Sequence, residues 1–130
     1  MDDTVPAMAQ WTPLMKYVDG YLIPVPVHHK AAYLEMAARA AAVLKELGAT
    51  RVVEAWGDDL PKGKVTDFKK AVKARRDECV VFSWVEYPSK AVRDAALKRM
   101  RDDPRLLPDG PLPFDGQRMF WGGFAPLLDT

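Results

Sequence analysis

In the segments that are richest in β-branched and aromatic residues, charged and aromatic side chains occur two positions apart. Side chains two positions apart in a strand share a face, so a carboxylate and a ring spaced in this way point to the same side of a sheet. We therefore expect one cavity lined by Asp19, Tyr21, Glu54, Trp56, Trp84, Glu86 and Arg118. A carboxylate such as Glu54 or Glu86, with its pKa raised by burial, would act there as a general base, and Arg118 would hold an anionic group.

We expect this cavity on the sheet face that points away from the helices, because a helix-packed face tolerates a carboxylate worse than a wet cavity does. The same charged groups also have a structural interpretation. Buried charges are costly unless they are paired, so the three carboxylates and Arg118 could pair at an interface or lie in water at strand ends. The sequence leaves both interpretations open.

The segment GDDLPKGK (57–64) directly follows a predicted strand and invites comparison with a phosphate-binding loop. Such a loop has four residues between its glycines and a Ser or Thr after its lysine, whereas five residues intervene here and Val65 follows. Asp58 and Asp59 would also repel a phosphate. We therefore predict a mobile loop over residues 57–65 and no nucleotide site.

Other residue types that often carry chemistry have ordinary structural explanations in this chain. His28 and His29 are adjacent and point in different directions, whereas two metal ligands on one helix need a spacing of four. Cys79 has no sequence neighbour that would lower its pKa, and Ser83 lacks the glycines of a nucleophile elbow. We predict no metal site and no cofactor.

The composition is that of one ordinary globular domain. The chain has 130 residues, of which 48% are hydrophobic and 28% charged. Its formal net charge is +1, whereas a nucleic-acid-binding protein usually carries a clear basic excess. A basic run does extend over residues 62–76, but acidic residues dilute it, so RNA binding is only the third alternative.

Membrane association and secretion are not expected. No apolar stretch reaches about 18 residues, and the first residues are acidic where a secretory leader needs basic ones. The single Cys79 is compatible with a reducing compartment. We therefore expect a cytoplasmic protein.

The periodicity of the apolar residues predicts one α+β domain over residues 16–130, preceded by a flexible tail over residues 1–15. We expect strands over residues 17–25, 50–56, 79–87 and 117–124, with a further short strand or strand extension over 67–74. Two amphipathic helices should begin near His28 and after Ser89, the first ending at Gly48. The four prolines within residues 104–113 predict an irregular connection. This β-α-β-β-α-β order is that of a ferredoxin-like antiparallel sheet with two helices on one face.

The predicted sheet needs a cover on its second face, since two helices cover only one. Apolar side chains nevertheless occupy both faces of the third strand, with Phe82 and Trp84 on one side and Val81 and Val85 on the other. A face carrying such rings would make an unusually large exposed patch. We expect a second copy of the chain to cover it, which gives a homodimer.

Five stretches resemble one bacterial family: YVDGYLIPVP (17–26), RVVEAWGDDLPKGKVTDFKKAVKA (51–74), VVFSWVEYPSKAVRDA (80–95), DDPRLLP (102–108) and PFDGQRMFWGGF (113–124). The chain resembles the YbaA-like family of unknown function, within the dimeric α/β-barrel superfamily. The resemblance covers nearly everything from Lys16 to Leu128. It implies the ferredoxin-like fold and the sheet-to-sheet dimer. It implies no function, because the family has no established one and therefore no catalytic residues to carry over. The wider superfamily ranges from enzymes to plain ligand binders, so the fold leaves the chemistry open.

These observations predict a homodimeric barrel that binds a small organic molecule and that is, in one version, a cofactor-independent enzyme. The alternative is a non-enzymatic homodimeric interaction module whose inner face serves dimerisation alone. A weak RNA binder is the third interpretation.

Overall fold

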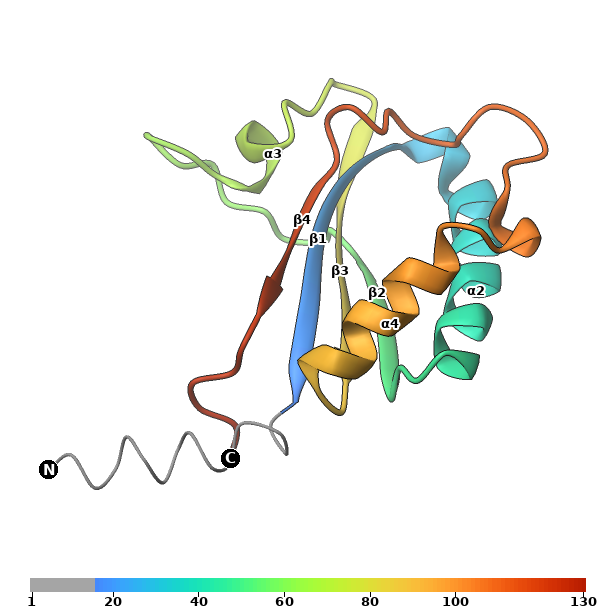
Figure 1. The fold of residues 1–130 in the computed structure, drawn as a ribbon. Coiled ribbons are helices and arrows are strands. Elements are labelled where there is room, and N and C mark those ends of the chain that lie inside the picture. Colours follow the sequence, from blue (N-terminus) through green and yellow to red (C-terminus); the bar gives the residue numbers. More distant parts are fainter. Residues whose placement is uncertain (1–15) are drawn as a thin grey trace, which may run out of the picture.

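A computed structural model describes residues 16–130, so the predicted tail over residues 1–15 lies outside the described residues. The described chain forms a four-stranded antiparallel open sheet with three α-helices (Figure 1). The strands are β1 (Tyr17–Pro26), β2 (Arg51–Trp56), β3 (Glu78–Tyr87) and β4 (Phe120–Phe124). The helices are α2 (Lys30–Glu46), α3 (Phe68–Ala71) and α4 (Lys90–Met100), with 3-10 turns η2 (Val27–His29) and η3 (Pro104–Leu106). The predicted mixture of helices with an antiparallel sheet is confirmed.

The strand order is β2-β3-β1-β4, so β1 and β3 are central. β1 pairs with β3 along its whole length, from Tyr17 opposite Tyr87 to Pro26 opposite Glu78. Residues directly opposite each other in an antiparallel pair share a face of the sheet. The pairing register therefore decides which side chains can meet, and sequence alternation alone does not.

The ends of the two long helices follow from particular residues. Gly48 comes just after α2 with a φ of +122°, a conformation that side chains rarely adopt and glycine does without strain. Ser89 caps α4, because its Oγ accepts a hydrogen bond from the backbone N–H of Val92 at 3.2 Å. Both predicted boundaries are confirmed.

The hydrophobic core lies between the sheet and the two long helices, which cover the same side of the sheet (Figure 1). One buried cluster joins Tyr33 and Ala37 of α2 to Ile23, Val25 and Val81 of the sheet. A second cluster joins α2 to α4 and consists of Leu44, Ala49, Val85, Tyr87 and Ala96. We call this the helix side of the sheet.

The opposite side, which we call the open side, carries exposed aromatic rings. Phe82 of β3 and Phe120 and Phe124 of β4 are 48%, 47% and 61% exposed. Phe68 of α3 also lies on this side, with its ring centroid 6.2 Å from that of Phe82. Helices α2 and α4 leave this face uncovered (Figure 1).

One predicted strand and one predicted strand boundary are wrong. Residues 67–74 contain the short helix α3 instead of a strand, because the Asp67 carboxylate accepts hydrogen bonds from the N–H groups of Lys70 and Gly63 at 2.7 and 3.0 Å and so caps a helix. The last strand begins at Phe120 and not at Gln117, since the residues before it form a turn in which the Arg118 N–H donates to the Asp115 carbonyl. The mobility predicted for residues 57–65 stays a prediction.

None of the helices within residues 16–130 has the length and apolar character needed to cross a membrane.

Candidate functional site

Glu54 lies at the centre of a small polar cluster on the helix side of the sheet. Tyr33, which α2 holds over the sheet, donates a hydrogen bond from its hydroxyl to Glu54 Oε1 at 2.6 Å. Ser83 lies directly opposite Glu54 in the β2–β3 pairing and donates from Oγ to Glu54 Oε2 at 2.9 Å. Each carboxylate oxygen therefore accepts one bond from a hydroxyl. We call Tyr33, Glu54 and Ser83 the Glu54 cluster.

Burial differs among these three groups. Tyr33 and Ser83 are 5% and 3% exposed, whereas Glu54 is half-buried. Burial, reinforced by the hydrogen bond to Glu54, raises the pKa of Tyr33 far above its usual value. Tyr33 therefore stays protonated and remains a hydrogen-bond donor at any physiological pH.

The Glu54 cluster lines a cavity of about 180 Å³ between α2 and the sheet, which we call the inner cavity. Its other walls are apolar or aromatic and include Ile23, Met36, Ala41, Leu44, Phe114 and Met119. Tyr21 also lines it, and burial followed by the negative charge of Asp19 raises the pKa of Tyr21 to about 12. Among the described residues that line the inner cavity, Glu54 is the only charged one.

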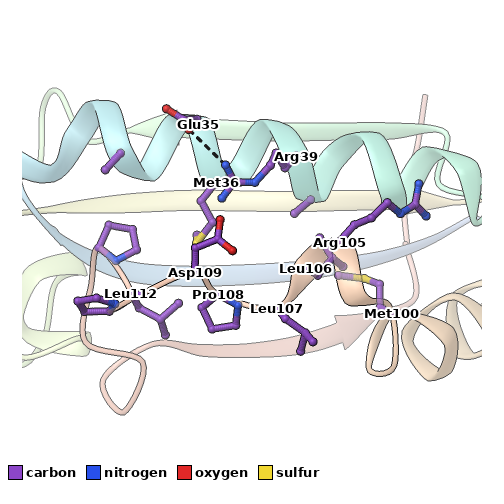
Figure 2. A pocket seen from close by; sticks show the side chains of 15 residues that line it. Glu35, Met36, Arg39, Met100, Arg105, Leu106, Leu107, Pro108, Asp109 and Leu112 are labelled. Carbon is purple, nitrogen blue, oxygen red and sulfur yellow. Dashed lines mark hydrogen bonds and ion pairs between the residues drawn. The ribbon is translucent and has the colours of Figure 1, made fainter.

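A larger groove of about 390 Å³ lies outside the inner cavity, between α2 and the proline-rich segment 104–113 (Figure 2). The two spaces share Met36, Ala40 and Met100 as lining residues, so they adjoin. In Figure 2, Met36 extends from α2 toward Asp109 in the proline-rich segment. We call this space the outer groove.

The residues predicted to line one cavity lie on both sides of the sheet, so that prediction is corrected. Tyr21 pairs with Ser83, and Ser83 with Glu54, which puts these three side chains on the helix side. Asp19 pairs with Val85, and Trp56 pairs with Val81, on the same side. Trp84 and Glu86 fall on the open side, because they alternate with Ser83 and Val85 along β3.

Asp19 shows why the argument from charge chose the wrong face. Its side chain is fully buried on the helix side, yet Arg93 of α4 reaches it with Nε at 2.9 Å and Nη2 at 2.9 Å from Oδ1. The Arg93 guanidinium lies over the rings of Tyr17 and Trp121, 5.0 and 5.5 Å from their centroids. A helix-packed face can hold a carboxylate when a neighbouring helix supplies its counter-charge.

Arg118 and Glu86 also have structural partners away from the inner cavity. Arg118 makes two hydrogen bonds to Glu78, at 2.6 and 2.7 Å, and a third to Asp115 at 2.9 Å. Glu86 accepts a hydrogen bond from Trp84 Nε1 at 3.0 Å and lies 3.6 Å from Arg51. Of the predicted site residues, only Tyr21 and Glu54 therefore line the inner cavity, and Trp56 packs against the neighbouring core.

Sequence reasoning gave Ser83 a structural explanation and did not single out Tyr33, so it missed two of the three residues of the Glu54 cluster. The available signal was a serine in the middle of an otherwise apolar and aromatic strand. This serine points to the cluster only when the β2–β3 pairing register, which puts Ser83 opposite Glu54, is known.

The remaining candidates have structural contacts. The His29 ring donates from Nδ1 to the Pro113 carbonyl at 3.2 Å, and the Cys79 thiol donates to the Gly57 carbonyl at 3.2 Å. Over residues 16–130 there is no group of three or more His, Cys, Asp or Glu side chains placed to hold a metal ion.

Comparison with known proteins gives a family without an assigned activity. A family model described as a protein of unknown function (DUF1428) matches residues 16–116, so the chain belongs to this family. The uncharacterized protein YbaA of Escherichia coli (strain K12) and that of Shigella flexneri are each 59% identical to it over 116 residues. Each match covers 88% of this chain and 99% of the relative. The resemblance to a YbaA-like family is confirmed.

One solved structure, that of the de novo designed protein Foldit4, aligns with this chain. The alignment covers 88% of this chain and 99% of the Foldit4 chain. The TM-score is 0.42 and the identity 12%, which is too low to support an inference about fold or function.

Proposed function

We propose that this protein is a homodimeric, ferredoxin-like α/β barrel that binds a small organic molecule in the inner cavity. The observation that carries the proposal is the Glu54 cluster, a hydrogen-bonded carboxylate at the wall of an otherwise apolar cavity. An apolar pocket with a few convergent polar groups is the usual form of a small-molecule site.

The hydrogen bonds of Glu54 leave it able to bind a ligand. A carboxylate offers about four lone-pair positions, and Tyr33 and Ser83 occupy two of them. The cavity of about 180 Å³ also has a useful size, since an apolar cavity of about 150 Å³ can hold benzene. A molecule of roughly one ring therefore fits beside the free lone pairs of Glu54.

Catalysis without a cofactor is the more demanding version of this proposal. Glu54 would accept a proton from the bound molecule, while Tyr33 and Ser83 hold the carboxylate in place. Glu86 and Arg118 take no part in this version, because their contacts lie elsewhere.

Two features of the sheet support the proposed barrel and dimer. The order β2-β3-β1-β4 with both long helices on one side is the arrangement expected of a ferredoxin-like fold. The exposed rings of Phe82, Phe120 and Phe124 on the open side support a second sheet as their cover. In this arrangement the two inner cavities lie outside the interface, one in each chain.

Native mass spectrometry of the protein purified from its own host tests ligand binding directly. We expect about one small organic molecule per chain. Ala41→Leu, which adds bulk to the cavity wall, should abolish the adduct, whereas Ala42→Leu at the exposed neighbouring position should keep it. An adduct equally abundant in all three proteins would place the ligand elsewhere. A wild-type protein without any adduct would favour the non-enzymatic interaction module.

A further inference from the structure

We propose that the inner cavity selects a neutral or cationic molecule that carries a hydrogen-bond donor, such as a phenol, an alcohol or an amine about one ring in size, and rejects anions. This inference rests on the proposed function and adds the chemical class of the ligand.

The charge of the cavity wall disfavours an anionic ligand. Glu54 is the one charged group among the described lining residues, so the wall carries no lysine, arginine or histidine to balance an incoming anion. Arg93, whose charge acts on Tyr21 in the cavity wall, already has two carboxylate partners: it is bonded to Asp19 and also to Asp94 at 2.8 Å. An anion in the cavity would be a second negative charge beside the half-buried Glu54, which is unfavourable.

The outer groove leads to the same conclusion. Its two arginines are paired, Arg39 with Glu35 at 3.2 Å and Arg105 with Asp103 at 2.7 Å. Arg105 is bonded in addition to Glu46, outside the groove. Among the described residues that line the groove, a ligand that enters past Met36 and Met100 therefore meets no unpaired cation that would attract an anion.

The hydrogen bonds within the Glu54 cluster favour a ligand that carries a donor. Tyr33 and Ser83 donate their hydroxyl protons to Glu54, so the cluster presents acceptor positions to the cavity and its own donors are used. A ligand that brings a donor occupies the free acceptor positions of Glu54, whereas a ligand with acceptors alone leaves these positions without a donor.

The apolar part of the cavity wall consists largely of rings and thioethers. The rings of Tyr21, Tyr33 and Phe114 and the thioethers of Met36 and Met119 line the cavity. Aromatic faces attract cations, and thioethers pack well against aromatic rings. These contacts favour an aromatic or cationic body for the ligand.

Four probes of similar size separate the effect of the ligand's charge from that of its hydrogen-bond donor. They are benzylamine, phenol, toluene and benzoate, each titrated by calorimetry into the wild-type protein at neutral pH. We expect benzylamine and phenol to bind at one site per chain and benzoate not to bind. Both binding signals should disappear in Ala41→Leu and persist in Ala42→Leu. Glu54→Gln, checked for folding by circular dichroism, should weaken benzylamine by about tenfold or more, because it removes a charge-assisted hydrogen bond.

The outcomes distinguish this inference from the proposed function. Benzoate binding as tightly as benzylamine, with loss in Ala41→Leu, would overturn the ligand class and leave the cavity as a binding site. Toluene binding as tightly as phenol would also overturn it, because the donor would then contribute nothing. If none of the four probes binds, both this inference and the proposed function are wrong.

Discussion

Asp19 has no contact with solvent, and Arg93 of α4 supplies its counter-charge. The Arg93 side chain is itself only 12% exposed. Removing one member of such a pair leaves an uncompensated buried charge, which typically costs about 3–5 kcal/mol. We therefore expect Arg93→Ala to lower the free energy of unfolding by about this amount in urea titrations.

Arg39→Ala is the matched control, since Arg39 forms an exposed pair with Glu35 one helical turn away. Such pairs contribute about 0.5 kcal/mol or less. Equal losses in the two variants would contradict the structural role of Arg93.

Glu78 makes the stability of the fold sensitive to acid. The hydrogen bonds from Arg118 hold the pKa of Glu78 below its usual value, although burial acts in the opposite direction. Ionised Glu78 therefore stabilises the folded chain above its unfolded pKa of about 4.3, and this contribution is lost as the pH falls through the lower folded pKa. Between neutral pH and pH 3, the urea midpoint should fall less in Glu78→Gln than in the wild type.

Glu35→Gln, at an exposed position on α2, should keep the pH dependence of the wild type. The prediction fails if the midpoint of Glu78→Gln falls as much as that of the unmodified protein.

At the scale of the elements, Gly48 fixes the link between α2 and β2. Its φ of +122° is strained for any other residue, and a Cβ there would come within 2.5 Å of Val92 Cγ1. We expect Gly48→Ala to lower the free energy of unfolding by about 1–3 kcal/mol in urea. Gly110→Ala is the control, because a Cβ at Gly110 meets nothing within 4 Å. A loss of the same size at both glycines would refute this account of the turn.

The strands and long helices could be predicted because their signals are local. Gly48 and Ser89 mark helix boundaries through their own conformation and side chain, and β-branched and aromatic residues identify β1 and β3. The helix α3 escaped prediction, since only the bonds of Asp67 to Gly63 and Lys70 reveal the cap. The candidate site depends on register and on which face a helix covers, and period-two alternation specifies neither.

At the scale of the whole molecule, the proposed homodimer would use the open side of the sheet. A homodimer would cover Phe82, which is 48% exposed in the single chain. We expect sedimentation at micromolar concentration to give about twice the 14.6 kDa chain mass. Phe82→Glu should give the monomer, because a charge in an apolar interface is costly.

Leu34→Glu, at an exposed position of α2, should remain a dimer. A wild-type mass near that of one chain would contradict the proposed dimer. It would leave the proposal of ligand binding in the inner cavity unchanged.

The location of a bound ligand is the central claim, and a crystal structure of the protein with phenol tests it most directly. We predict density for the ring between α2 and the sheet, with its hydroxyl within hydrogen-bond distance of Glu54. Density for phenol only among the rings of the open side, or an inner cavity closed by its own side chains, would contradict the claim.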